Sequence, residues 1–89
     1  MINMELTQLF EQAVTNSKLL SSKPDNETLL KLYSLYKQTT EGDVLPDSEP
    51  SNPFDFVAKA KFNAWTELKG KSKENAMQEY VDLVSNLSK

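Results

Sequence analysis

The segment Leu32-Tyr-Ser-Leu-Tyr-Lys-Gln-Thr-Thr-Glu-Gly-Asp43 decides the fold, because it joins a helical pattern to a helix end. Tyr33, Tyr36 and Lys37 are separated by steps of three, four and one residues, so their side chains lie on one side of a helix. That face offers aromatic rings, phenolic hydroxyls and an ammonium group. These groups suit a ligand that combines a heteroaromatic ring with phosphate, as a nucleotide does.

Helical periodicity continues upstream of this segment. Apolar residues at helical spacing predict a first helix from about residue 4 to about residue 19: Leu6, Phe10, Ala13 and Val14. Pro24 interrupts the pattern, since proline disfavours helical geometry in the residue before it. Asp25 as N-cap and Gly42 as C-cap then delimit a second helix over about 25–41.

Two more helices are expected downstream of a proline-rich loop at 43–53. This loop is long for a helix-to-helix connection, so the third helix can run parallel to the second. Apolar residues at steps of four and three predict a third helix over about 55–68, with the last two expected in the core: Phe54, Ala58, Phe62 and Trp65. Ser72 as N-cap and a broad apolar face predict a fourth helix over about 72–87.

No stretch of the sequence shows the alternation of apolar and polar residues that marks a β-strand. At 89 residues, with 38% hydrophobic and 26% charged residues, the chain has the composition of one globular domain. We therefore expect an all-α fold in a single domain over residues 1–89.

The chain contains no Cys and no His. Thiolate or imidazole metal sites, Cys nucleophiles and Ser-His-Asp relays are thereby excluded, and no pair of acidic residues stands out as a general acid and base. The sequence thus predicts no catalytic residue, no metal and no cofactor, and a protein that is not an enzyme. Since it shows no signal peptide and its longest aliphatic or aromatic run is Phe56-Val57-Ala58, we expect a cytoplasmic protein without membrane insertion.

A net charge of -3 argues against general affinity for nucleic acid, whose binding depends on neutralising many phosphates. The ten basic residues are all lysines, and five of them fall within residues 59–73, where Glu67 is the only acid. This distribution favours a local positive patch that binds a compact anion. A solvated lysine face is an equally good interpretation of the run by itself.

Three residues outside the second helix could complete a site, because one lysine cannot hold a phosphate cluster. They are Lys18, Lys61 and Tyr80. Lys61 lies one turn from apolar positions, so its stem should follow the core boundary and leave the ammonium at the edge. Tyr80 falls in the apolar stripe of the fourth helix, where its hydroxyl needs a partner. Tyr33 and Tyr36, taken alone, are more commonly half-buried core residues than ligand contacts.

Three blocks of the sequence stand in a characteristic order: Tyr33-Ser-Leu-Tyr-Lys-Gln-Thr-Thr-Glu-Gly-Asp43, Lys59-Ala-Lys-Phe-Asn-Ala-Trp-Thr-Glu-Leu-Lys-Gly70 and Ser72-Lys-Glu-Asn-Ala-Met-Gln-Glu-Tyr80. On these blocks, and over nearly its whole length, the chain resembles the acyl-CoA-binding protein family, also known as the diazepam-binding-inhibitor family. The resemblance implies a skewed four-helix bundle of up-down-down-up topology that binds medium- and long-chain fatty acyl-CoA esters in an open bowl.

The resemblance also implies a set of ligand-binding residues. Those expected to contact the phosphorylated ribose are Tyr33, Lys37, Lys61 and Tyr80, and those expected around the adenine are Val14, Lys18 and Tyr36. The chain departs from the family in its longer loop over 43–53, which lacks an Arg-Pro-Gly segment, and in Phe62, which stands where a second Trp is common. The preferred acyl length therefore stays open.

The function implied by the resemblance is that of a monomeric carrier and pool former for acyl-CoA esters, which delivers them to acyl-CoA-using enzymes. Two other classes of function remain open from the residues. One is a helical protein-interaction module that docks an acidic partner through its Tyr/Lys face. The other is an enzyme acting on CoA thioesters, which the lack of a nucleophile constellation disfavours.

Overall fold

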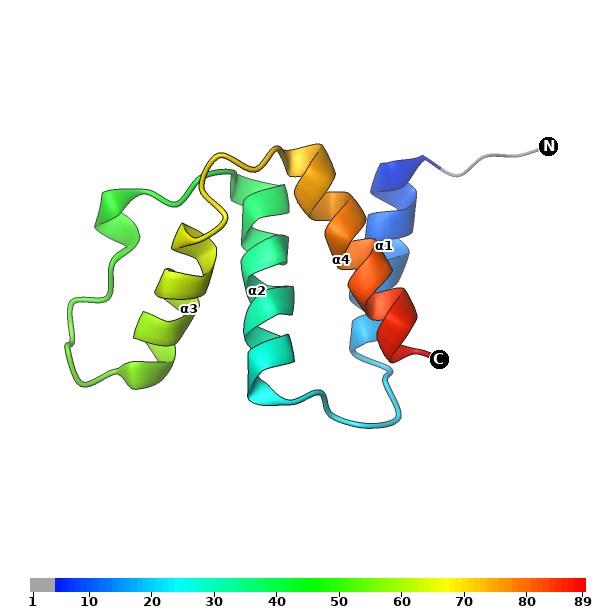
Figure 1. Cartoon of the computed structure of the whole chain (residues 1–89), viewed down its shortest axis with the longest axis horizontal. Coiled ribbons are helices and arrows are strands. Elements are labelled where there is room, and N and C mark those ends of the chain that lie inside the picture. Colours follow the sequence, from blue (N-terminus) through cyan, green and yellow to red (C-terminus); the bar gives the residue numbers. More distant parts are fainter. Residues whose placement is uncertain (1–4) are drawn as a thin grey trace.

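The computed structural model describes residues 5–89, and this part of the chain forms four α-helices and one short 3-10 helix, with no strand. The helices are α1 (Leu6–Ser17), α2 (Asn26–Glu41), η1 (Pro46–Ser48), α3 (Phe56–Thr66) and α4 (Lys73–Leu87). The α-helices lie in the order α3, α2, α4, α1 across the molecule (Figure 1), since α2 packs against α3 and α4, and α1 packs against α4. The expected all-α fold is confirmed.

The topology follows from the connection between α2 and α3. Residues 42–55 return the chain from the end of α2 to the level of its start, so that α2 and α3 run in the same direction (Figure 1). The other two helices, α1 and α4, run in the opposite direction. The up-down-down-up arrangement predicted from the sequence is confirmed.

Local capping explains where α2 and α4 begin. The side chain of Asp25 accepts a hydrogen bond from the Thr28 N–H at 2.8 Å, and Oγ of Ser72 accepts one from the Asn75 N–H at 3.1 Å. At its other end, α2 stops at Gly42, which has a φ of +84° that favours glycine. These three predicted helix ends are confirmed.

The first and third helices are shorter than the sequence predicted. α1 ends at Ser17 instead of near residue 19, and its expected start at residue 4 lies outside the described residues. α3 covers Phe56–Thr66 instead of 55–68, because residues 67–70 form turns. After both helices, backbone N–H groups bond to carbonyls three residues back, which tightens the last turn and ends the helix.

The hydrophobic core lies between α1, α2 and α4. Its buried side chains are Phe10, Ala13, Leu32, Leu35, Ala76, Tyr80 and Val84. The Phe10 ring stacks on Tyr36, with centroids 5.9 Å apart, and meets the edge of Tyr80 at 5.0 Å. None of the helices in residues 5–89 has the length and apolar character that crossing a membrane requires.

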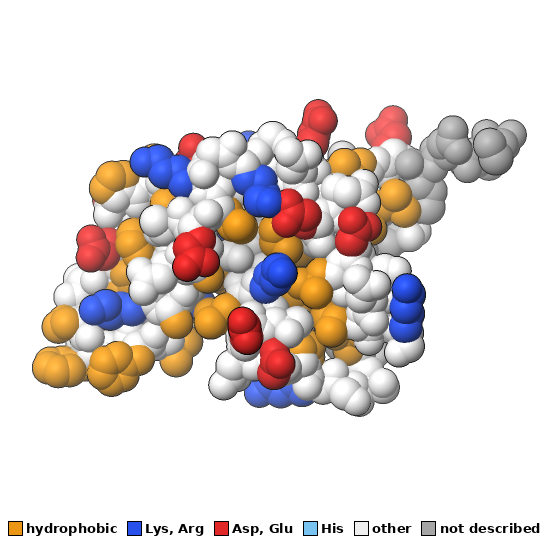
Figure 2. Space-filling view, viewed as in Figure 1, with side chains coloured by type: hydrophobic (Ala, Val, Ile, Leu, Met, Phe, Trp, Pro, Cys, Tyr) orange, Lys and Arg blue, Asp and Glu red, His pale blue; other side chains and the backbone are white. Residues whose placement is uncertain are grey.

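α3 lies outside this core and buries one side chain, Trp65, as expected. The prediction that Phe62 is a core residue is wrong, because Phe62 is only partly buried and lines a cavity. The reason is that α3 packs mainly against one neighbour, α2, which leaves much of its apolar side uncovered. Figure 2 shows hydrophobic side chains gathered where α3 begins, and there Phe54 is 79%, Phe56 74% and Val57 66% exposed.

Candidate functional site

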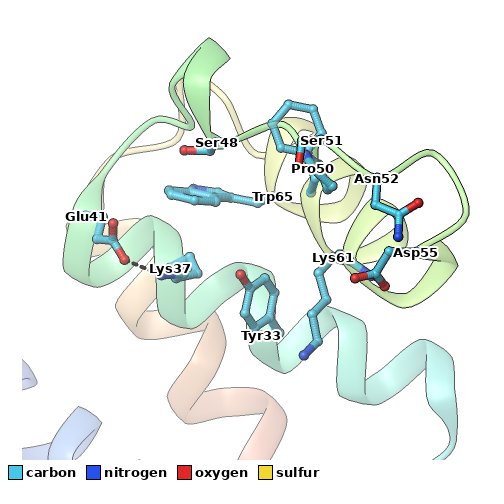
Figure 3. Close-up of a pocket in the computed structure, with 12 residues that line it drawn as sticks. Tyr33, Lys37, Glu41, Ser48, Pro50, Ser51, Asn52, Asp55, Lys61 and Trp65 are labelled. Carbon is cyan, nitrogen blue, oxygen red and sulfur yellow. Dashed lines mark hydrogen bonds and ion pairs between the residues drawn. The ribbon is translucent and has the colours of Figure 1, made fainter.

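A cavity of about 490 Å³ lies between α2, α3 and the segment that connects them. Its charged and aromatic lining consists of Tyr33, Lys37, Glu41, Asp55, Lys61, Phe62 and Trp65. Figure 3 shows side chains of α2 facing side chains of α3 across this space. We call the cavity the lysine hollow.

Both lysines of the lysine hollow lie over aromatic rings. Nζ of Lys37 is 5.4 Å from the centroid of the Trp65 ring, and Nζ of Lys61 is 5.2 Å from that of Tyr33. Lys37 also donates a hydrogen bond to Oε2 of Glu41, one helical turn further on (Figure 3). This bond raises the pKa of Lys37 above its ordinary value, so its ammonium stays charged at neutral pH.

A second cavity, of about 300 Å³, lies on the other side of Tyr33, between α1, α2 and α4. We call it the tyrosine hollow, and it is lined by Val14, Ser17, Lys18, Pro24, Leu29, Leu32, Tyr33, Tyr36 and Tyr80. Tyr36 keeps 40% of its surface exposed here, whereas Tyr80 is buried and its hydroxyl donates to Oγ of Ser17 at 3.3 Å. Three tyrosine side chains therefore line this cavity.

A third cavity, of about 360 Å³, lies between the starts of α2 and α3. We call it the apolar hollow, and it is lined by Asn26, Leu29, Leu30, Phe56, Val57, Ala60 and Lys61. Sequence reasoning missed this feature. The signal was present in the adjacent apolar residues Leu29-Leu30 and Phe56-Val57, because neighbours in a helix cannot all face the same core.

Shared lining residues show that the three cavities adjoin one another. Tyr33 lines both the lysine hollow and the tyrosine hollow, and Lys61 lines both the lysine hollow and the apolar hollow. Leu29 lies between the tyrosine hollow and the apolar hollow in the same way. Cationic, aromatic and apolar surfaces therefore meet around the first half of α2.

The seven residues predicted from the sequence are divided between the first two cavities. The lysine hollow contains Tyr33, Lys37 and Lys61, and the tyrosine hollow contains Val14, Lys18, Tyr33, Tyr36 and Tyr80. Tyr80, which was expected to meet the same ligand group as the two lysines, does not line the lysine hollow; it lines the tyrosine hollow, and its hydroxyl donates to Ser17 of α1. Tyr33 is the residue that connects the two sets.

Trp65 fixes the position of α3, and hence of Lys61, relative to α2. Its indole N–H donates to Oε1 of Gln38 at 3.1 Å and to the carbonyl of Gly42 at 2.9 Å. The Gln38 side chain is fully buried, and its amide nitrogen donates to Oδ1 of Asp43 and to the carbonyl of Lys71, each at 2.8 Å. A buried amide thus links α2, α3 and the turn before α4.

Asp43 completes this group of hydrogen bonds. Its Oδ1 accepts the backbone N–H of Gly70 at 2.9 Å in addition to the Gln38 amide. These two hydrogen bonds, the one from Gly70 first, hold the pKa of Asp43 below its ordinary value. We call Gln38, Asp43, Trp65 and Gly70 the junction network.

Residues 7–84 match the profile of the family described as Acyl CoA binding protein. The chain belongs to the acyl-CoA-binding protein family. An acyl-CoA-binding protein from Dictyostelium discoideum is 49% identical over 81 residues, which cover 89% of this chain and 92% of that protein. Enoyl-CoA delta isomerase 2 from Rattus norvegicus is 54% identical over 82 residues, which cover 91% of this chain. This chain spans only 20% of the isomerase's length.

The family assignment extends to the fold. The crystal structure of acyl-CoA-binding protein 2 from Oryza sativa matches the present structure with a TM-score of 0.85 at 38% identity. The match covers 93% of this chain and 90% of the rice protein chain. The resemblance to the acyl-CoA-binding protein family seen in the sequence, and the helical bundle it implied, are both confirmed.

Proposed function

We propose that this chain binds medium- and long-chain fatty acyl-CoA esters and acts as a monomeric cytoplasmic carrier and pool former that supplies acyl-CoA-using enzymes. The observation that carries the proposal is that the lysine, tyrosine and apolar hollows adjoin one another at Tyr33, Lys61 and Leu29. A ligand with a phosphate group, a heteroaromatic ring and an apolar chain has one part that suits each of these three cavities.

In this proposal the lysine hollow receives the 3′-phosphate of the ligand. Lys37 and Lys61 would donate charge-assisted hydrogen bonds, each worth about 1.5–3 kcal/mol in a sheltered site and less in an open one. The phenolic group of Tyr33 lies beside both lysines and would bond the same ribose phosphate. Tyr80 would approach the ribose from the tyrosine hollow, where Val14, Lys18 and Tyr36 would surround the adenine.

The acyl chain would lie in the apolar hollow between the starts of α2 and α3. Phe56 and Val57 are largely exposed in the present structure, and a hydrocarbon chain would remove their surface from water. Each buried methylene contributes about 0.8 kcal/mol, part of which is offset by the loss of chain freedom. Long-chain esters should therefore bind more tightly than free CoA.

We further propose that no bond is made or broken in this site. The chain has no Cys or His, and the two carboxylates of the lysine hollow are already engaged. Glu41 accepts from Lys37, and Asp55 accepts the Ala58 N–H at the start of α3. The activity of longer relatives such as the rat isomerase is not part of this proposal.

Titration calorimetry with palmitoyl-CoA and with CoA, in separate cells, tests the proposed function. Palmitoyl-CoA should bind at least about tenfold more tightly than CoA, because each 1.4 kcal/mol of tail burial is a factor of about ten. Heat from neither ligand would reject the carrier and would favour a module that docks an acidic protein partner. Recovery of intact ester after long incubation would support the absence of catalysis.

Lys61→Ala should weaken palmitoyl-CoA binding about tenfold without changing the thermal unfolding midpoint, because Lys61 acts through the ligand head group. Tyr33→Phe should weaken binding by less, since it removes only a neutral hydroxyl. The matched control is Lys59→Ala, on the same helix, whose side chain is exposed and lies outside the three hollows. Equal losses of binding in Lys61→Ala and Lys59→Ala would contradict the assignment of Lys61.

A further inference from the structure

The lysine hollow contains an anion of its own, the carboxylate of Glu41. This carboxylate accepts a hydrogen bond from Nζ of Lys37, which also lies over the Trp65 ring (Figure 3). The Lys37 ammonium is therefore held between a carboxylate and an indole. Any other anion that reaches Lys37 therefore competes with Glu41 for this ammonium group.

The position of Glu41 is not explained by helix stability. Glu41 is the last residue of α2, where the negative end of the helix dipole disfavours a carboxylate. The order of the pair, with lysine four residues before the acid, is also the weaker one for stabilising an isolated helix. The two features left to account for Glu41 at this position are its ion pair with Lys37 and its place in the wall of the lysine hollow.

Lys61 differs from Lys37 in this respect. The ion pairs found within residues 5–89 join Lys37 to Glu41 and Lys71 to Glu79, so Lys61 makes none in the part of the chain that the structure describes. Both lysines line the lysine hollow, and the Glu41 carboxylate is tethered one turn from Lys37 on the same helix. A doubly charged phosphate has the advantage over the internal carboxylate, and a weak monoanion does not.

We propose that Glu41 is an internal competitor for the ligand phosphate, which occupies Lys37 in the free protein and is displaced when the 3′-phosphate binds. The inference rests on the proposed function. Glu41 thereby lowers the affinity of the site for ligands that place the 3′-phosphate at Lys37, and it leaves the affinity of ligands without that phosphate unchanged.

The test compares Glu41→Gln with wild type in titrations of palmitoyl-CoA and of palmitoyl-dephospho-CoA, which lacks the 3′-phosphate. Glu41→Gln should bind palmitoyl-CoA about two- to fivefold more tightly than wild type, the range expected for loss of one exposed ion pair. The gain should shrink at high salt and vanish with the dephospho ligand. Glu79→Gln is the matched control, since it removes the same charge and breaks the ion pair with Lys71, outside the three hollows.

A second background isolates the role of Lys37. In Lys37→Gln, the added change Glu41→Gln should no longer alter the affinity for palmitoyl-CoA, because the two side chains act as a pair. Equal gains in Glu41→Gln and Glu79→Gln, or a gain that persists without Lys37, would overturn the inference and reveal a general charge effect. Neither outcome would change the binding of palmitoyl-CoA by the wild-type protein, and it is this binding that tests the proposed function.

Discussion

The interface of α4 with α1 and α2 differs in kind from the interface of α2 with α3. The first is an apolar core of buried side chains such as Phe10, Leu35 and Val84. The second depends on the junction network, in which a fully buried Gln38 links Trp65 to Asp43. The two interfaces thus stabilise the same helix, α2, on opposite sides by different forces.

The two interfaces therefore contribute differently: the apolar core mainly to the stability of the fold, and the junction network mainly to the distance between α2 and α3. Hydrophobic burial has no preferred direction, so the apolar core supports the fold without setting exact distances. Hydrogen bonds depend on distance and angle, so the junction network fixes how far α3 lies from α2. Since Lys61 comes from α3 and Lys37 from α2, the junction network sets the width of the lysine hollow.

The largest expected effect comes from Trp65→Ala, which removes a buried aromatic side chain together with two hydrogen bonds. It should lower the free energy of unfolding by about 3–5 kcal/mol, measured by chemical denaturation. Palmitoyl-CoA binding by the folded fraction should fall as well, because α3 loses its anchor. If this variant does not fold, Trp65→Phe keeps most of the ring volume and still removes the N–H donor.

Leu35→Ala provides the comparison from the apolar core, since Leu35 is 1% exposed. It should cost about 2–5 kcal/mol of stability and leave ligand affinity nearly unchanged in the folded protein. Equal losses of affinity in Trp65→Ala and Leu35→Ala would remove the distinction between the two interfaces. A mild stability effect of Trp65→Ala would show that α3 is held by other contacts.

A smaller effect is expected from Gln38→Leu, which keeps the volume of the side chain and removes its hydrogen bonds. The indole N–H of Trp65 then retains only the Gly42 carbonyl, and the stability loss should be about 1–3 kcal/mol. Amide hydrogen exchange should accelerate in α3 and at Gly70 more than in α4. Ser34→Ala is the control, because buried Ser34 bonds only within its own helix, to the Lys31 carbonyl; faster exchange in α3 for this variant as well would point to a general loosening.

The smallest effect is the pH dependence contributed by Asp43. Its pKa is lowered in the folded protein by Gly70 and Gln38, so its stabilising contribution is complete above the ordinary Asp value. That contribution is lost as the pH falls through the lowered folded pKa, which lies below about 4. Asp43→Asn should therefore flatten the loss of stability in acid, measured as the unfolding midpoint against pH.

Asp25→Asn serves as the counterpart of Asp43→Asn at the start of α2. Hydrogen bonds from Thr28 likewise lower the pKa of Asp25, so the change should also flatten the acid dependence. Hydrogen exchange at the Gly70 amide should respond to Asp43→Asn and not to Asp25→Asn, since only Asp43 accepts that amide. An equal response to both would place Asp43 outside the junction network.

Sequence reasoning succeeded where the rules are local. Asp25 and Ser72 were identified as caps because capping depends on residues within one turn. Helical spacing placed Tyr33, Tyr36 and Lys37 on one face, and Tyr33 does line a cavity with each of the other two, but Tyr36 and Lys37 line different cavities. The parallel course of α2 and α3 followed from the length of the loop between them.

Sequence reasoning failed where the number of neighbours decides the outcome. The spacing of Phe62 and Trp65 marks an apolar face, but it cannot show that α3 has one main partner and that Phe62 remains half open. The partnership of Tyr80 with Ser17 joins residues far apart in the chain, and no local rule brings them together. Gln38 was missed for the same reason, since an amide in a helix gives no sign of burial.

The place of α4 in the fold has a consequence for how the protein is made. α1 and α2 both pack against α4, and α4 is the last of these three helices to be synthesised. A nascent chain that stops before residue 73 lacks the α4 side chains Ala76, Tyr80 and Val84, which complete the core around Phe10 and Leu35. The core therefore closes only after synthesis of α4, and until then apolar side chains of α1 and α2 stay exposed to other chains.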